Sequence, residues 1–170
     1  MAWAPRVAFS SGILEAAAIK PEGNLTQRLL KLVRLQVSLE ASCAFCFDMN
    51  AAEYLKAGLT SAEIAALQRQ HNPRQIRTLS VAERLALTYA CEITATPIAV
   101  SEKTINGLKT HSSEREILLL AAVVAQVNYW ARFMQGLGVP PAGFSPECVL
   151  LPGMGEGRTR LTLQSESTKG

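Results

Sequence analysis

The sequence predicts an all-α protein, a bundle of six to seven helices, on three observations. Apolar residues recur at helical spacing in several segments, and three Ser or Thr residues are each followed by Glu three positions later. At that spacing the hydroxyl and the carboxylate each accept a backbone N–H at the start of a helix. No segment alternates apolar and polar residues as a half-buried strand does.

The first two expected helices follow each other closely. The first covers residues 25–39, which are rich in Leu, Lys, Arg and Gln and carry apolar groups at helical spacing. A break at residues 40–42 then starts a second helix. It carries two closely spaced cysteines and ends at Gly58, because glycine adopts the left-handed conformation that commonly closes a helix.

Four more helices are expected at residues 60–69, 80–94, 102–110 and 113–135. Thr60, Ser80 and Ser113 begin three of them with the Ser/Thr-to-Glu pattern. Proline prevents two of these helices from continuing. Pro97 follows the helix at 80–94, and a proline pair that begins with Pro140 follows the helix at 113–135. We expect an N-terminal extension at residues 1–24, a helical domain at 25–144 and a Pro/Gly/Ser-rich tail at 145–170.

Composition restricts the functional classes. A length of 170 residues suggests one domain, and 48% hydrophobic against 18% charged residues suggests apolar surface that an oligomer would cover. The net charge of +3 is spread along the chain, so we expect no nucleic-acid partner. The start of the chain does not resemble a signal peptide. The apolar run from Ile117 to Ala125 is shorter than the ~20 residues that span a bilayer. A cytoplasmic protein without a membrane partner is expected.

The cysteines carry the strongest functional signal. Cys43 and Cys46 lie three positions apart, within one helical turn, so they can cycle between a dithiol and a disulfide. Amide dipoles at a helix start stabilise a thiolate. Cys91 lies in an apolar helical pattern and is expected to be a buried, inert thiol. Cys148 lies in the tail and is expected to be passive, unless it reaches an active site in a neighbouring subunit.

Three interpretations of the close pair remain open. Zinc binding would require further ligands at suitable spacing, and the two histidines, His71 and His111, are isolated, so no metal is expected. The cysteines could be two small core residues. Thiol redox chemistry is the favoured interpretation. A thioredoxin domain is excluded, because it would need strands alternating with helices around the pair.

The residues around the pair resemble a known family. The run from Cys43 to Thr60 is similar to the core of the carboxymuconolactone decarboxylase-like family, in its alkylhydroperoxidase D-like branch. Residues 83–90, 128–133 and 136–139 also resemble later helices of that family, in the same order. The resemblance implies a helical subunit that forms dimers, trimers or hexamers. We expect no cofactor.

The resemblance also implies roles for the two thiols. Cys46 would attack an organic hydroperoxide, and Cys43 would resolve the resulting sulfenic acid into a disulfide. A lipoyl-bearing or thioredoxin-like protein would supply the reducing thiols. The expected activity is therefore thiol-dependent peroxide reduction of the peroxiredoxin type, or a related disulfide exchange.

Two positions differ from the family pattern. The family has a histidine four residues after the second cysteine, where this chain has Asn50, and a glutamate twelve residues before the first, where it has Lys31. Asn50 can orient a peroxide by hydrogen bonding but cannot accept the thiol proton. Glu40, one turn before Cys43, is the nearest replacement carboxylate, whereas Asp48 and Glu53 are expected in surface or interhelix salt bridges. The candidate catalytic residues are Cys46, Cys43, Asn50 and Glu40.

Two other functions fit the same residues. The chain could be a non-enzymatic helical assembly or a redox-sensing module, which the residues at positions 31 and 50 favour. It could also be a carboxymuconolactone decarboxylase-type lyase acting on a lactone. The cysteine pair and the scarcity of histidine argue against the lyase.

Overall fold

The computed structural model describes residues 4–16, 20–69, 72–146 and 148 and confirms the all-helical fold class. Within these residues it contains seven α-helices and two short 3-10 helices, η1 and η2, and no strand. The α-helices are α1 (Pro5–Ala16), α2 (Gln27–Glu40), α3 (Ala44–Ala51), α4 (Ser61–Arg69), α5 (Val81–Thr94), α6 (Glu102–Lys109) and α7 (Glu114–Gly136), with η1 at Tyr54–Ala57 and η2 at Pro73–Gln75.

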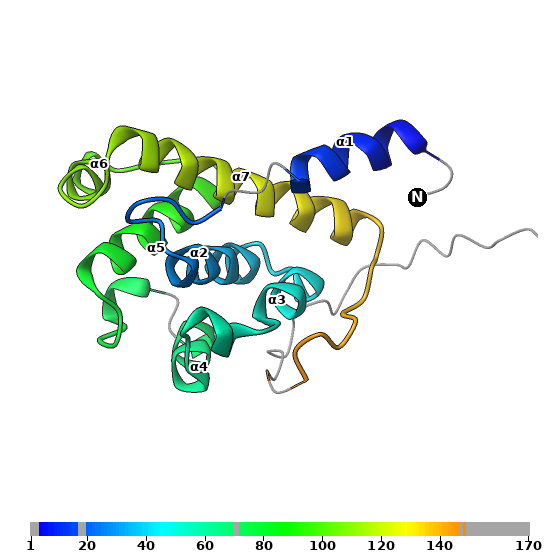
Figure 1. Cartoon of the computed structure of the whole chain (residues 1–170), viewed down its shortest axis with the longest axis horizontal. Coiled ribbons are helices and arrows are strands. Elements are labelled where there is room, and N and C mark those ends of the chain that lie inside the picture. Colours follow the sequence, from blue (N-terminus) through cyan, green and yellow to red (C-terminus); the bar gives the residue numbers. More distant parts are fainter. Residues whose placement is uncertain (1–3, 17–19, 70–71, 147, 149–170) are drawn as a thin grey trace, which may run out of the picture.

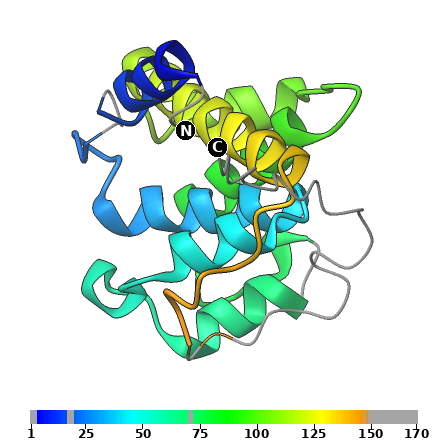
Figure 2. The same cartoon turned by 90° about the vertical axis from the view of Figure 1, so that its right-hand side faces the viewer.

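Helix α2 forms the centre of the molecule. It packs against α3, α5 and α7, and its Leu32, Val33 and Leu35 are completely buried. Figures 1 and 2 show α7 crossing one side of α2, while α4 lies on the other side. Burial of one large aliphatic side chain contributes roughly 1.5–3 kcal/mol, so these contacts fix the position of α2 relative to its neighbours.

The expected caps are present where they were read from sequence. Ser80 and Ser113 each accept a hydrogen bond from the amide of the glutamate three positions later, and each glutamate accepts from the cap amide in return. Gly58 has a φ of 76° and ends η1 in the left-handed conformation. These interactions are local in sequence, which is why the pattern predicted them.

The second expected helix is shorter than predicted. It ends at Ala51 instead of continuing to Gly58. Glu53 adopts a left-handed φ of 56°, after which the chain forms η1 and turns Tyr54 into the core, where it is 6% exposed. Lys31 Nζ donates to the carbonyl of Ala52 at 2.9 Å and so caps the interrupted end of α3.

The expected N-terminal extension contains a helix that the sequence did not predict. Helix α1 has one buried side chain, Ser11, and therefore shows no apolar stripe. It lies along the C-terminal half of α7, where the hydroxyl groups of Ser11 and Tyr129 are hydrogen-bonded at 2.7 Å (Figure 1). The division at residues 24 and 144 remains a prediction, and most of the expected tail lies outside the residues that the structure describes.

The apolar part of helix α7 extends beyond the run from Ile117 to Ala125 that the sequence shows. Its 23 residues are long and apolar enough to cross a membrane by length and composition alone. One such helix is weak evidence, because a core helix passes the same test. Leu120, Val123 and Val124 of α7 are buried in the core, so we interpret α7 as a core helix.

Candidate functional site

The two cysteines of the close pair are joined as a disulfide at the start of α3. Their Cα atoms are 5.2 Å apart, and both side chains are buried, at 0% exposure for Cys43 and 1% for Cys46. Cys43 is the N-cap of α3, and its Sγ accepts the backbone N–H of Cys46 at 3.2 Å. A positive φ of 50° at Ser42 makes the sharp turn from α2 into α3 that brings this about.

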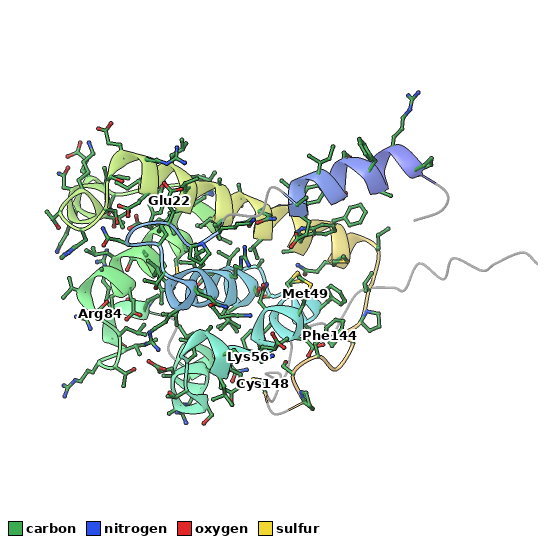
Figure 3. All side chains as sticks on the ribbon, viewed as in Figure 1. Glu22, Met49, Lys56, Arg84, Phe144 and Cys148 are labelled. Carbon is green, nitrogen blue, oxygen red and sulfur yellow. A yellow bond between two sulfur atoms is a disulfide. The ribbon has the colours of Figure 1, made fainter. Side chains whose placement is uncertain are left out.

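A small cavity of about 20 Å³ lies beside Cys46. That volume holds little more than one water molecule. Residues from four helices line it: Glu15 of α1, Arg34 of α2, Cys46, Met49 and Asn50 of α3, and Gln126, Val127 and Trp130 of α7. Figure 3 shows Met49 on α3, on the side of this helix that is turned toward α7. Cys43 does not line it, so the cavity leads to the second cysteine of the pair.

Asn50 is brought next to Cys46, as the spacing of four residues predicts. Its side chain is 9% exposed, and Nδ2 donates to Ser38 Oγ at 3.1 Å. The Ser38 hydroxyl in turn donates to the carbonyl of Arg34 at 2.8 Å. These bonds hold the amide with its carbonyl oxygen available as an acceptor.

Glu40 lies in a different cluster. Its Oε1 accepts from Gln36 Nε2 at 3.0 Å and from the thiol of Cys91 at 3.3 Å. Burial raises the pKa of the Cys91 thiol, and the charge of Glu40 raises it further. Cys91 is therefore a neutral thiol at physiological pH, and the polar contacts of Glu40 are made with α2 and α5.

Sequence reasoning missed two charged residues of the cavity, Arg34 and Glu15. Burial lowers the pKa of Arg34, and the negative charge of Glu15 opposes this shift. Glu15 Oε2 accepts from Trp130 Nε1 at 2.9 Å and from Gln126 Nε2 at 3.2 Å. Glu15 lies in the expected extension and 28 or more positions before the cysteines, so no local spacing could have indicated it.

Asp48 is also placed differently from the sequence-based expectation. It is buried, at 3% exposure, and forms no salt bridge within the described part of the chain. Its Oδ2 accepts the backbone amides of Ala142, Gly143 and Phe144 at 2.7–3.1 Å. Its Oδ1 accepts the amide and the hydroxyl of Ser145 at 2.8 and 2.9 Å.

This network ties the segment after α7 to the cysteine helix. The ring of Phe144 contacts that of Phe45 edge-on, with centroids 6.4 Å apart. Figure 3 shows Phe144 on this segment beside α3. We call residues 142–145 the strap. Glu53, by contrast, is exposed and pairs with Lys56 at 2.6 Å, as expected of a surface group.

Two of the remaining sequence candidates, Cys148 and His111, do not line the cavity. Cys148 is half-buried and packs against the main core cluster. His111 lies between α6 and α7, where its carbonyl accepts from Asn24 Nδ2 at 3.2 Å. His71 is outside the described residues. Among the residues that are described, no three His, Cys, Asp or Glu side chains gather as metal ligands would.

Comparison with known proteins agrees with this arrangement. Residues 11–75, which include α2, α3 and both cysteines, match the model of the carboxymuconolactone decarboxylase family. The uncharacterized protein YdfG of Bacillus subtilis (strain 168) is 26% identical over 118 residues, which are 69% of this chain and 78% of YdfG.

Solved structures share the fold. A protein of unknown function from Agrobacterium tumefaciens, for which an AhpD-type antioxidant role has been suggested, superposes with a TM-score of 0.70 at 23% identity, over 83% of this chain and 96% of that one. The debrominase Bmp8 superposes with a TM-score of 0.69 at 19% identity, over 82% of this chain and 74% of Bmp8.

Residues 11–75 thus match the carboxymuconolactone decarboxylase family, and the described chain has the same helical fold as the AhpD-like structures. This confirms the resemblance that the sequence motifs indicated. The family includes enzymes. Of the similar proteins named above, YdfG is uncharacterized and Bmp8 is a debrominase.

Proposed function

We propose that this protein reduces hydroperoxides with the thiols of Cys43 and Cys46, or carries out a related disulfide exchange. The observation that carries the proposal is the joining of the two sulfurs at the start of α3 while one of them, Cys46, borders a cavity. A substrate reaching that cavity meets Cys46 first. This favours Cys46 as the attacking thiol and Cys43 as the resolving one.

The proposed cycle uses both thiols of the pair and one external dithiol. The Cys46 thiolate attacks the terminal peroxide oxygen, and an S–O bond forms as the O–O bond breaks, so that Cys46 becomes a sulfenic acid. The alkoxide that leaves takes a proton from water and departs as the alcohol. The Cys43 thiol then attacks the Cys46 sulfur, and water leaves as the disulfide forms. An external dithiol restores both thiols with two electrons. A lipoyl-bearing or thioredoxin-like protein is the class of reductant that we propose.

The position of Cys43 at the start of α3 indicates which sulfur of the disulfide the reductant attacks. The Cys46 amide already points at Cys43 Sγ, and this donor would stabilise a thiolate on Cys43. A stabilised thiolate is a better leaving group, so the reductant should attack Cys46 at the cavity and expel Cys43. The reductant and the peroxide would thus both react at Cys46, the cysteine that lines the cavity.

Asn50 is proposed to orient the peroxide, since it lines the same cavity. Glu40 was the candidate replacement base, and its hydrogen bonds to Gln36 and Cys91 support a role in holding α2 to α5 instead. Because general acid-base help contributes roughly 10²–10⁴-fold, we expect slower turnover than in relatives with a complete proton relay.

We also propose that the protein is cytoplasmic and forms a homo-oligomer. Apolar side chains on the outer surfaces of α1 and α7 support the oligomer, with Phe9 72% and Leu118 69% exposed. Analytical ultracentrifugation of the full chain tests it, and a monomer at micromolar concentration would contradict it.

Stopped-flow oxidation of the reduced protein by cumene hydroperoxide, with peptide mapping, tests the chemistry. We expect a Cys43–Cys46 disulfide in the wild type and a sulfenic acid trapped at Cys46 in Cys43→Ser. Cys46→Ser should abolish the fast phase, while Cys91→Ser should keep it. Oxidation no faster than that of a free thiol, or a fast phase that survives Cys46→Ser, would show that the proposal is wrong. Slow, reversible disulfide formation without turnover would favour the redox sensor.

A further inference from the structure

The cavity beside Cys46 contains an arrangement of donors that suits a carboxylate. Trp130 Nε1 and Gln126 Nε2 both point at a single oxygen, Oε2 of Glu15. The side chain of Arg34 lines the same cavity. An indole N–H, an amide N–H and a guanidinium together are the groups that recognise a carboxylate.

Arg34 is the cation that lines this cavity, and no described residue pairs with it closely. Its side chain is half-buried, and within the described residues its guanidinium makes no hydrogen bond and no salt bridge. Glu15 acts on it only through the attraction of the opposite charges. A partly desolvated guanidinium is costly unless it is paired, and it stays charged at neutral pH. An anion entering the cavity would satisfy it.

Glu15 is held by contacts that could be exchanged. Its side chain is exposed, and α1 meets α7 mainly through polar groups: Ser11 with Tyr129, and Gln126 with both the carbonyl of Leu14 and the carboxylate of Glu15. The apolar side chains Val7, Phe9 and Ile13 of α1 face outward. Little apolar burial therefore opposes the release of the carboxylate from its two donors.

We propose that Arg34, Gln126 and Trp130 form a binding site for the carboxylate group of a small organic substrate, and that Glu15 occupies this site as a resident competitor. The site adjoins Cys46, so a bound carboxylate would hold the rest of the substrate against the reactive sulfur. Its use in selecting a carboxylate-bearing hydroperoxide rests on the proposed function. The anion site itself does not.

Binding of benzoate to the full chain tests the site without any redox chemistry. The sequence has two tryptophans, so a Trp3→Phe background makes Trp130 the fluorescence reporter. In this background we expect Glu15→Gln to bind benzoate about ten-fold more tightly, which corresponds to ~1.4 kcal/mol, the size of one charge-assisted hydrogen bond. Arg34→Met should lose saturable binding, and neutral benzamide should bind no variant more tightly than wild type.

Matched controls change the same residue types elsewhere. Glu114→Gln at the far end of α7 and Arg77→Met, both exposed, should bind benzoate as wild type does. Equal affinity in Glu15→Gln and wild type, or undiminished binding in Arg34→Met, would overturn the proposal. A loss of benzoate binding in Glu15→Gln would also overturn it, because Glu15 would then be part of the site and not a competitor.

The substrate class is tested with a fatty-acid hydroperoxide and its methyl ester. We expect the acid to oxidise Cys46 faster than the ester in wild type, and Arg34→Met to remove this preference. If no hydroperoxide oxidises Cys46 while benzoate behaves as expected, the peroxide function is wrong and the anion site stands. Equal rates for acid and ester, with fast disulfide formation, would support the peroxidase and refute carboxylate selection.

Discussion

Asp48→Asn should release the strap from the cysteine helix. In the wild type, Oδ2 of Asp48 accepts three backbone amides and Oδ1 accepts the amide and hydroxyl of Ser145. Asparagine keeps one oxygen and replaces the other with an NH₂ group. Whichever way the amide turns, at least one backbone N–H loses its acceptor, and the bonds that remain are made to a neutral oxygen in place of a charged one.

The magnitude follows from those contacts. A buried donor left without its acceptor costs about 1–3 kcal/mol, and water can reach part of the strap once it loosens. We therefore expect Asp48→Asn to lower the free energy of unfolding by about 2–4 kcal/mol, measured by urea denaturation. Hydrogen exchange of the amides at 142–145 should accelerate in the same variant, while exchange in α5 should change little.

The pH dependence provides a second readout. Burial alone would raise the pKa of Asp48, but the hydrogen bonds from Ser145, Phe144 and Gly143 outweigh it and hold the pKa below its ordinary value. The stabilisation is therefore complete above the unfolded pKa of about 3.9 and is lost as the pH falls through the folded value. The difference between wild type and Asp48→Asn should be constant near neutral pH and shrink in acid.

The strap also covers the cysteine helix through Phe144 and Phe45. Alkylation of reduced Cys46 should thus be faster in Asp48→Asn than in wild type. Glu53→Gln, an exposed carboxylate on the adjoining turn, is the matched control and should leave all three readouts unchanged. Unchanged stability and unchanged exchange at 142–145 in Asp48→Asn would refute the reasoning.

Three further predictions concern the scaffold. Gly23→Ala should lower the free energy of unfolding, measured by urea denaturation, by about 1–2 kcal/mol. Gly23 has a φ of 55°, and an added Cβ would collide with the Glu116 side chain. A variant as stable as the wild type would contradict this. Arg28→Met should lower the free energy of unfolding by about 1–2 kcal/mol in the same assay, because Arg28 pairs with Glu63 at 2.5 Å and with a second glutamate. This value lies between those of exposed and buried ion pairs. An unchanged free energy of unfolding would show that the two ion pairs do not stabilise the fold. Cys91 should resist iodoacetamide at pH 8.5 in the folded protein and react once urea unfolds it, because its pKa is raised; rapid labelling of the folded protein would exclude the neutral thiol.

Features that depend on neighbours along the chain were predictable from the order of the residues. The caps at Ser80 and Ser113, the left-handed conformation of Gly58 and the closeness of Cys43 and Cys46 all arise from groups within four residues of each other. Such geometry follows from the helical repeat, so composition and spacing were sufficient to predict it. The family resemblance rested on these same local motifs.

The surroundings of the two sulfurs depend on how the helices pack, which local patterns do not show. Glu15, Arg34 and Trp130 come from three helices and meet at one cavity beside Cys46, although none lies near it in sequence. The hydrogen-bond partners of Asp48 could not be predicted, because they are mainly backbone amides 94–97 positions away. A backbone amide is present at almost every residue, so the sequence does not mark the ones that Asp48 binds. Side-chain periodicity shows which face of a helix is apolar, whereas the partner of a polar group on that face depends on how the helices pack.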